Sequence, residues 1–223
     1  MRNKWIIIIP LITFTLSGCT YIQKIRRAGE LESENADLKY RLTQLQKEKA
    51  KEVERIAEEK DKELSELEQA KKELEESLKK EIGEYKAKLK MTERGLVITF
   101  LSEVFFDSGK DQVKPDGTSA LQKVAEVLNR DVPNSNVAIE GHTDNDPIKH
   151  SGWKSNWELS SARALAVLHY LIDDCTVKPE RLSANGYGEF QPVALNDSAQ
   201  NKQKNRRVEI VILPAKVNKV KAD

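Results

Sequence analysis

A single arginine interrupts an otherwise uncharged helical stretch in the second half of the chain. Between Leu159 and Ile172 the only formal charge is Arg163, and small and apolar residues surround it at helical spacing. Because an unpaired charge that faces the core is very costly, the guanidinium needs an anionic partner. That partner is either an internal carboxylate, with Asp144 and Glu140 as candidates, or the carboxylate of a ligand held in a bidentate manner.

The other reactive side chains do not form the pattern of a catalytic or metal centre. His142 and Asp144 have the spacing of a ligand pair, but His150 and His169 lack the spacing that would complete a metal site. We therefore interpret His142 as a structural residue in a turn. The serines do not occur in a nucleophile-elbow pattern. The sequence thus predicts a protein that is not an enzyme and uses neither a metal nor another cofactor.

The two cysteines have different predicted roles. Cys175 follows two aspartates, which raise the pKa of a thiol rather than activate it, so we interpret it as structural. Cys19 follows a basic start, a 12-residue apolar run and the small residues Ser17 and Gly18, which are the parts of a secretory signal over residues 1–18. The run is shorter than the roughly 20 apolar residues that span a bilayer. A short membrane anchor or a poorly cut signal is the alternative.

The end of this segment, Leu16 to Cys19, resembles the lipobox of bacterial lipoproteins. The resemblance implies cleavage before Cys19, a diacylglyceryl thioether on its sulfur, and acylation of the new amino terminus, for example with palmitate. Several acyl chains on one residue give stable anchoring in a lipid bilayer. Thr20, rather than aspartate, follows the cysteine, which implies sorting to the outer membrane with the chain facing the periplasm. Residues 19–29 are then a lipidated linker.

A charge-dense helix is predicted over residues 30–94. The segment lies between Gly29 and Gly95, contains no proline and carries 35 of the 73 charged side chains of the chain. Its apolar residues recur with a mean spacing of about 3.6, which favours the narrow seam of a coiled coil that pairs with a second copy or with an envelope protein. A solvated single helix, stabilised by pairs of opposite charge, is the alternative. In both cases the segment is a spacer of roughly 100 Å.

A compact α+β domain is predicted over residues 95–215, followed by a basic tail over 216–223. Helices are expected from Pro115 and from the capping box that begins at Ser155, with a short helical turn over 197–205. Strands are expected over 96–106, 137–140, 182–187 and 208–212. The order β-α-β-α-β-(α)-β predicts a sheet that helices cover on one side.

The charge balance restricts the class of partner. The chain has 37 basic and 36 acidic residues and a net charge of +1. Proteins that bind nucleic acid through a broad basic surface carry a clear positive excess. We therefore do not expect nucleic acid as a partner.

Several motifs in the domain occur in the order of a known family. They are Val104-Phe105-Phe106-Asp107-Ser108-Gly109, Gly141-His142-Thr143-Asp144, Ser155-Asn156-Trp157-Glu158-Leu159-Ser160 with Ala162-Arg163-Ala164, Gly186-Tyr187-Gly188, and Asn205-Arg206-Arg207-Val208-Glu209-Ile210. Over about 110 residues the domain resembles the OmpA-like (OmpA/MotB) peptidoglycan-binding domain, and the loop after Asp144 is closer to its MotB side. We do not expect a motor stator, because the apolar leader contains no membrane-embedded acid.

The resemblance implies binding to meso-diaminopimelate in the peptide stem of peptidoglycan. In this reading Asp144 faces the ammonium of diaminopimelate and Arg163 takes its free carboxylate. The other implied contacts are Asn156, Thr143, Asp107 with its following loop, and Arg206. The expected function is a lipid-anchored tether between the outer membrane and the cell wall. The alternative is an envelope scaffold whose coiled coil recruits partners while wall binding serves localisation.

Overall fold

The computed structural model describes the backbone of residues 8–84, 86–149 and 151–214, and their side chains from residue 21 onward. Of the predicted signal segment, only the backbone of residues 8–18 is described; its side chains, the side chain of Cys19 and the basic tail lie outside the described part. The chain divides into two compact units that meet between Glu58 and Glu59. Within the described residues, no helix combines the length and the apolar character needed to cross a membrane.

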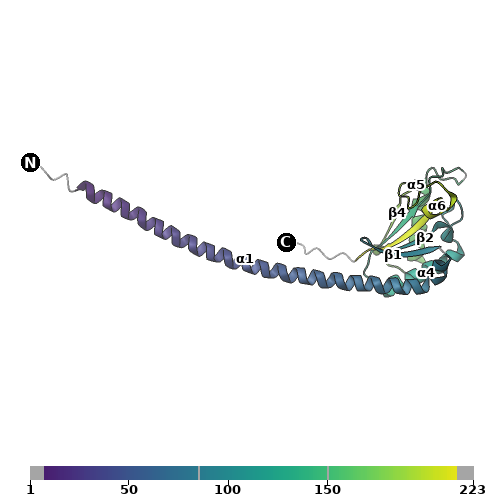
Figure 1. Ribbon diagram of the computed structural model, residues 1–223, viewed down its shortest axis with the longest axis horizontal. Coiled ribbons are helices and arrows are strands. Elements are labelled where there is room, and N and C mark those ends of the chain that lie inside the picture. Colours follow the sequence, from purple (N-terminus) through teal and green to yellow (C-terminus); the bar gives the residue numbers. More distant parts are fainter. Residues whose placement is uncertain (1–7, 85, 150, 215–223) are drawn as a thin grey trace, which may run out of the picture. The chain divides into compact units, whose positions relative to one another are not determined.

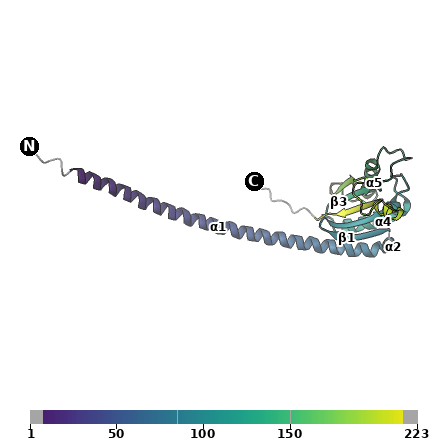
Figure 2. The same cartoon turned by 45° about the horizontal axis from the view of Figure 1, so that its top comes forward.

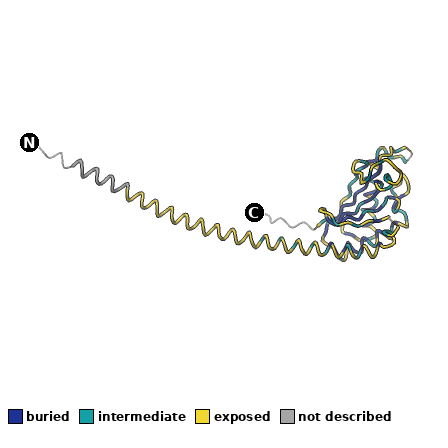
Figure 3. Tube along the Cα trace, in the orientation of Figure 1, coloured by how far each residue is buried: buried dark blue, intermediate teal, exposed yellow. Residues whose placement is uncertain are grey.

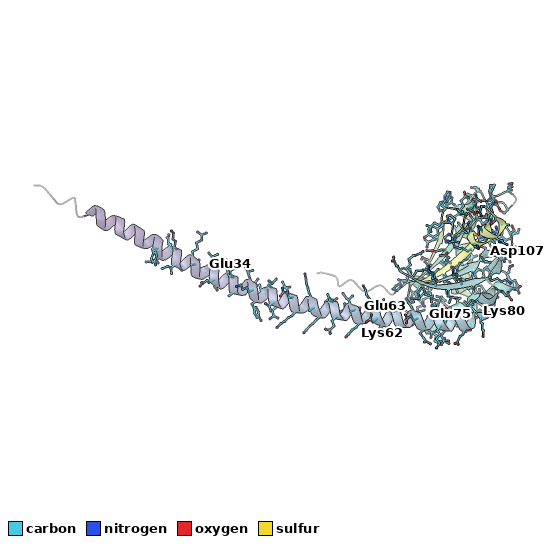
Figure 4. All side chains as sticks on the ribbon, in the orientation of Figure 1. Glu34, Lys62, Glu63, Glu75, Lys80 and Asp107 are labelled. Carbon is cyan, nitrogen blue, oxygen red and sulfur yellow. The ribbon has the colours of Figure 1, made fainter. Side chains whose placement is uncertain are left out.

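Helix α1 (Ile8–Ser77) is the long helix of the chain (Figure 1). Its part up to Glu58 forms the described part of the first unit, and its residues from Glu59 onward belong to the second unit. Over residues 21–58 nearly all side chains are exposed to solvent (Figure 3). Charged side chains such as that of Glu34 project from the helix along its length (Figure 4). Pairs one turn apart support it, for example Arg41 and Asp37, whose Nε and Oδ2 atoms are 2.8 Å apart. The predicted helix is confirmed over this range, whereas its role as a spacer stays a prediction.

The apolar seam of α1 has two different surroundings. Leu38, Leu42 and Leu45 are each more than half exposed. In the second unit, Leu67 and Leu74 are at most 3% exposed and join the core of the domain. The later part of the seam is therefore covered by the chain's own domain and is not available to pair with another helix.

The predicted helix over 30–94 is wrong at its carboxy-terminal end. Helix α1 ends at Ser77, the short helix α2 (Lys79–Gly83) follows, and β1 (Ala87–Thr92) is a strand (Figure 2). It pairs in antiparallel orientation with the next strand, β2 (Gly95–Leu101). In β1 the apolar residues Ala87, Leu89 and Met91 alternate with polar ones, which is the period of a half-buried strand. Only six residues carry this pattern, so the helical spacing that precedes them obscured it.

Five strands form one mixed sheet in the order β1-β2-β5-β3-β4. All neighbours are antiparallel except β3 and β4, which are parallel. The strands are β2 (Gly95–Leu101), β3 (Val137–His142), β4 (Leu182–Gly186) and β5 (Arg207–Ile212). The sequence predicted four of them, and the fifth is β1.

The first predicted strand, over 96–106, is too long. The chain leaves the sheet after Leu101 and forms the short helix α3 (Ser102–Phe105). Phe105 is fully buried and its ring centroid lies 4.9 Å from that of Phe100. A short apolar run is compatible with a buried strand and with a buried helical turn, so periodicity alone could not separate the two.

Helices α4 (Pro115–Arg130) and α5 (Asn156–Asp173) pack on one face of the sheet and complete the predicted α+β fold. The shorter helices of the domain are α6 (Ala199–Asn205) and the 3-10 helix η1 (Pro179–Arg181). Leu121 of α4 and Val167 of α5 are fully buried in the core against the sheet. The predicted cap of α5 is confirmed, because the hydroxyl of Ser155 accepts a hydrogen bond from the backbone N–H of Glu158 at 3.3 Å.

A pair of leucine substitutions on the same helix tests whether the last turns of α1 are part of the domain. Leu74→Ala should lower the free energy of unfolding of the domain by about 2–5 kcal/mol, because it empties a fully buried site. The matched control is Leu42→Ala, at a side chain 56% exposed, which should change it by less than about 0.5 kcal/mol. Denaturant unfolding measures both values, and equal effects would contradict the assignment.

Candidate functional site

A pocket of about 540 Å³ opens at one end of the domain. It lies between the loop after α3, the loop after β3, the start of α5 and the start of β5. All six residues that the sequence analysis selected line it: Asp107, Thr143, Asp144, Asn156, Arg163 and Arg206. The structure thus brings together side chains that are up to 99 positions apart in the sequence.

The side chain of Arg163 projects from α5 into this region and is only 5% exposed as a residue. Its Nε donates to the carbonyl oxygen of Lys110 at 2.9 Å, and its Nη2 donates to that of Asp107 at 3.1 Å. The guanidinium carbon lies 5.2 Å from the centre of the Phe106 ring, within reach of a cation–π contact. Among the described residues, no carboxylate forms an ion pair with Arg163, so the interpretation as an internal ion pair is wrong.

Burial and a neighbouring cation both affect the ionisation of Arg163. Desolvation, and next the positive charge of Arg206, lower the pKa of Arg163 to about 10. The carboxylates of Asp111 and Asp144 act in the opposite direction. A group with this pKa remains protonated at neutral pH. The pocket therefore contains a buried positive charge whose hydrogen bonds are made to backbone carbonyls rather than to an anion.

Asp144 follows β3 by two residues and is 5% exposed. Its Oδ2 accepts from Nη1 of Arg206 at 2.5 Å, and its Oδ1 accepts from the backbone N–H of Asp146 at 3.2 Å. The other candidate partner for Arg163, Glu140, pairs instead with Arg94 on a different part of the sheet. Asp144 and Arg206 thus form an ion pair within the lining of the pocket.

Asn156 positions the loop that forms one wall. Its amide nitrogen donates to the backbone carbonyl of Asp146 at 3.1 Å and to Oε2 of Glu189 at 2.6 Å. A longer contact of 3.4 Å reaches the carbonyl of Asp144. The sequence placed Asn156 correctly at the pocket, but these contacts show that much of its hydrogen-bonding capacity is used within the fold.

Thr143 and Asp107 contribute in different ways. The hydroxyl of Thr143 is buried and has no hydrogen-bond partner among the described residues, whereas its backbone N–H donates to the carbonyl of Gly188 at 2.9 Å. The carboxylate of Asp107 is 76% exposed, at the edge of the domain (Figure 4). Asp107 therefore accepts a hydrogen bond from Arg163 through its backbone carbonyl, whereas the hydroxyl of Thr143 is an unpaired polar group that is buried from solvent.

Two further contacts, which the sequence did not predict, hold the walls of the pocket together. The indole Nε1 of Trp153 donates to the carbonyl oxygen of Gly109 at 3.0 Å and joins the two long loops. Lys202 of α6 lies 2.7 Å from a carboxylate oxygen of Asp146. Both residues lie in polar segments without periodicity, and their partners are distant in the sequence, so no local signal identified them.

The pocket has the chemistry of a binding site for a small charged group. It places the carboxylate of Asp144 near two guanidinium groups, those of Arg163 and Arg206. Its described lining contains neither a histidine nor a cysteine that could act as a base or a strong nucleophile. The arrangement can hold an anion and a cation close together, as in a zwitterion.

Comparison with known proteins identifies relatives of this domain. Motility protein B of Bacillus subtilis is 42% identical over 149 residues, which are 67% of this chain and 57% of that protein. Outer membrane protein Omp38 of Acinetobacter baumannii is 40% identical over 105 residues, 47% of this chain and 28% of that protein. The chain thus spans little more than half of the first relative's length and less than a third of the second's.

A solved structure also resembles this domain. The cell wall anchor of the T6SS from Pseudomonas aeruginosa has a TM-score of 0.58 and 30% identity, and the match covers 63% of this chain and 96% of that one. The model of the OmpA family matches residues 105–206, a range that contains all the pocket residues from Asp107 to Arg206. Through this domain, which is of the OmpA/MotB type, the chain belongs to the OmpA family.

Proposed function

We propose that this protein binds peptidoglycan non-covalently through the diaminopimelate of its peptide stem and tethers the bacterial envelope to the cell wall. The observation that carries the proposal is the buried charge of Arg163, which lacks a carboxylate partner among the described residues and lines the same pocket as Asp144. The free end of diaminopimelate carries a carboxylate and an ammonium. A site for it needs one fixed cation and one fixed anion.

The hydrogen-bonding capacity of Arg163 supports a carboxylate as the ligand group. A guanidinium has five N–H donors, and two of those of Arg163 are used by the carbonyls of Lys110 and Asp107. These two bonds fix the plane of the guanidinium, while Nη1 has no hydrogen bond to a described residue. A carboxylate placed there would gain charge-assisted hydrogen bonds and neutralise a charge that the fold already holds in a desolvated position.

The relatives support the cell wall as the partner. The matched solved structure is described as a cell wall anchor, and one matched relative is an outer membrane protein. The family is one of structural anchoring domains rather than enzymes. We infer that the present chain likewise anchors and does not hydrolyse the wall.

The lipobox-like segment supports a lipid anchor at the other end of the chain. We infer that Cys19 carries the acyl groups and that the chain is held in the outer membrane with the domain in the periplasm. The helical spacer would then separate the lipid from the wall-binding pocket.

The exposed part of the seam favours a second candidate function. Leu31, Leu38, Leu42, Leu45 and Val53 are each about half or more exposed, at the spacing that pairs helices in a coiled coil. Residues of this kind are stabilised when a second helix covers them. In this alternative, the first unit recruits a second copy or another envelope protein, and wall binding localises the assembly.

The wall-binding proposal predicts that Arg163→Gln weakens binding to isolated sacculi by about 30-fold or more, the effect of removing one partner of a buried charge pair. Asp144→Asn should also weaken binding, because it removes the negative charge that is proposed to face the ammonium of diaminopimelate. The matched control is Arg181→Gln, because Arg181 is also a buried arginine that donates only to backbone carbonyls but lies outside the pocket. Sedimentation with sacculi measures binding, and circular dichroism verifies that each variant is folded.

Competition identifies the ligand group. Free meso-diaminopimelate should release the wild-type protein from sacculi, whereas cadaverine, which has the two ammonium groups and no carboxylate, should not. If Arg163→Gln and Asp144→Asn bind sacculi as tightly as Arg181→Gln does, the assignment of the pocket is wrong. If both compounds release the protein equally, the role of the carboxylate is wrong.

The lipid-anchor proposal predicts that Cys19→Ala moves the protein from the membrane fraction to the soluble periplasmic fraction. The same substitution should abolish incorporation of labelled palmitate, because the thiol that accepts the diacylglyceryl group is lost. Cys175→Ala is the control, since Cys175 is a partly buried thiol inside the domain. Unchanged labelling in Cys19→Ala would exclude Cys19 as the lipidated residue.

The second candidate predicts an oligomer whose stability depends on the seam. The double variant Leu38→Glu/Leu45→Glu should dissociate it, because it places charge at two apolar positions of the helix pair. Tyr40→Glu is the control, since Tyr40 is 65% exposed and lies off the seam. Sedimentation equilibrium of the full chain measures the mass. A wild-type protein that is monomeric at every concentration would contradict self-pairing.

A further inference from the structure

A second cluster of ionisable side chains lies on the sheet outside the pocket. Side chains alternate between the two faces of a strand. In β3 Ile139 faces the helices, so Glu140 and His142, which are two positions apart, both lie on the opposite face of the sheet. On β5, Glu209 is the register partner of Glu140, and Arg207 is the partner of His142. Glu140, His142 and Glu209 do not line the pocket.

His142 is the unusual member of this cluster. It is 2% exposed, and neither Nδ1 nor Nε2 has a hydrogen-bond partner among the described residues. One face of its ring stacks on Tyr187, with ring centroids 5.2 Å apart and planes 20° apart. Burying an imidazole without any hydrogen bond is costly, and such groups usually have a partner that satisfies them.

Two carboxylates lie close enough to this imidazole for all three groups to contact one ion. One ring nitrogen of His142 and one carboxylate oxygen each of Glu140 and Glu209 lie within 4.8 Å of one another. Tetrahedral zinc sites with bonds of about 2.0–2.2 Å hold their ligand atoms about 3.4 Å apart. Small rotations of the side chains would therefore bring the three atoms to coordinating distance.

We propose that Glu140, His142 and Glu209 form a binding site for a divalent transition-metal ion, with Zn²⁺ as the probe. One imidazole and two carboxylates are a ligand set that suits such an ion, and three protein ligands leave a fourth position for water. Coordination would satisfy a nitrogen of His142 that has no partner within the described chain. This site is independent of the proposed wall binding.

The surroundings keep His142 in the form that coordinates metal. Burial, followed by the positive charges of Arg207 and Arg94, lowers the pKa of His142 to about 3. At neutral pH the imidazole is therefore uncharged and has a lone pair available. A metal ligand must be in this deprotonated form.

Two arginines and a tyrosine hold the carboxylates in place. Arg94 donates to both carboxylate oxygens of Glu140, one of them at 3.1 Å, and the hydroxyl of Tyr187 lies 3.5 Å from Oε1 of Glu140. Nε of Arg207 donates to Oε1 of Glu209 at 2.6 Å, and no described residue donates to Oε2 of Glu209. Hydrogen bonds of this kind orient the carboxylate ligands of metal sites.

Arg94 also sets the strength of the site. The two arginines already balance the charge of the two carboxylates, so a bound ion adds positive charge beside them. The Arg94 side chain is 52% exposed and can turn into solvent, whereas that of Arg207 is 4% exposed. Arg94 therefore competes with the ion for Glu140. Removing the charge of Arg94 should therefore strengthen metal binding. If these residues served only to stabilise the fold, Arg94→Gln would not increase the affinity for the ion.

Isothermal titration of the full-length protein with zinc chloride tests the site. The experiment uses a His169→Gln background, because His169 and Asp173 lie 3.9 Å apart on the surface and can bind zinc weakly. One high-affinity Zn²⁺ per chain is expected, with no comparable binding of Mg²⁺, which prefers oxygen ligands alone. His142→Gln should weaken the affinity by about 100-fold or more, and Arg94→Gln should strengthen it by about 3- to 10-fold.

Glu209→Gln is a second ligand variant that tests the site even if His142→Gln does not fold. The side chain of Glu209 is less buried than that of Glu140, so the substitution should disturb the fold less. Zinc should raise the thermal unfolding temperature of the parent, because the ion binds the folded state, and this shift should be lost in Glu209→Gln. Circular dichroism verifies that each variant is folded. The proposal is overturned if the parent shows no zinc binding, if the folded His142→Gln and Glu209→Gln variants bind zinc like the parent, or if Arg94→Gln weakens binding.

Discussion

The domain depends on a buried guanidinium that the fold solvates with backbone carbonyls. Arg163 lies on the core-facing side of α5, where a lone charge is unfavourable, and the carbonyls of Lys110 and Asp107 offset part of that cost. The loop over 106–110 must therefore lie against α5, and this contact forms one wall of the pocket. Among the described residues the charge of Arg163 has no carboxylate partner, and the proposed binding of an anionic group rests on this.

The sheet fixes the other half of the pocket. Asp144 follows the end of β3 and Arg206 precedes the start of β5, and these antiparallel neighbours bring the two residues into an ion pair of 2.5 Å. The same register brings Glu140 opposite Glu209. One pairing of strands thus builds both the pocket and the separate cluster around His142. A shift of register by one residue would disrupt both, because it would move every side chain to the other face.

The long helix shows how one periodic pattern can serve two environments. Its apolar seam is exposed at Leu42 and fully buried at Leu74, although the spacing of the residues is similar along the helix. Periodicity indicates which face is apolar, but it does not indicate what covers that face. For the same reason the pattern concealed β1, whose few alternating residues follow the seam without a strong break.

The sequence by itself determined the family, the two longer helices of the domain, the cap at Ser155 and six of the residues that line the pocket. These features depend on local spacing and motif order. Only the tertiary structure decided the partners. It paired Asp144 with Arg206 and Glu140 with Arg94, and it left Arg163 bonded to carbonyls. Each of these contacts joins residues at least 46 positions apart. Which of several carboxylates meets a given arginine is set by the strand register and the paths of the loops, and neither is encoded in local spacing.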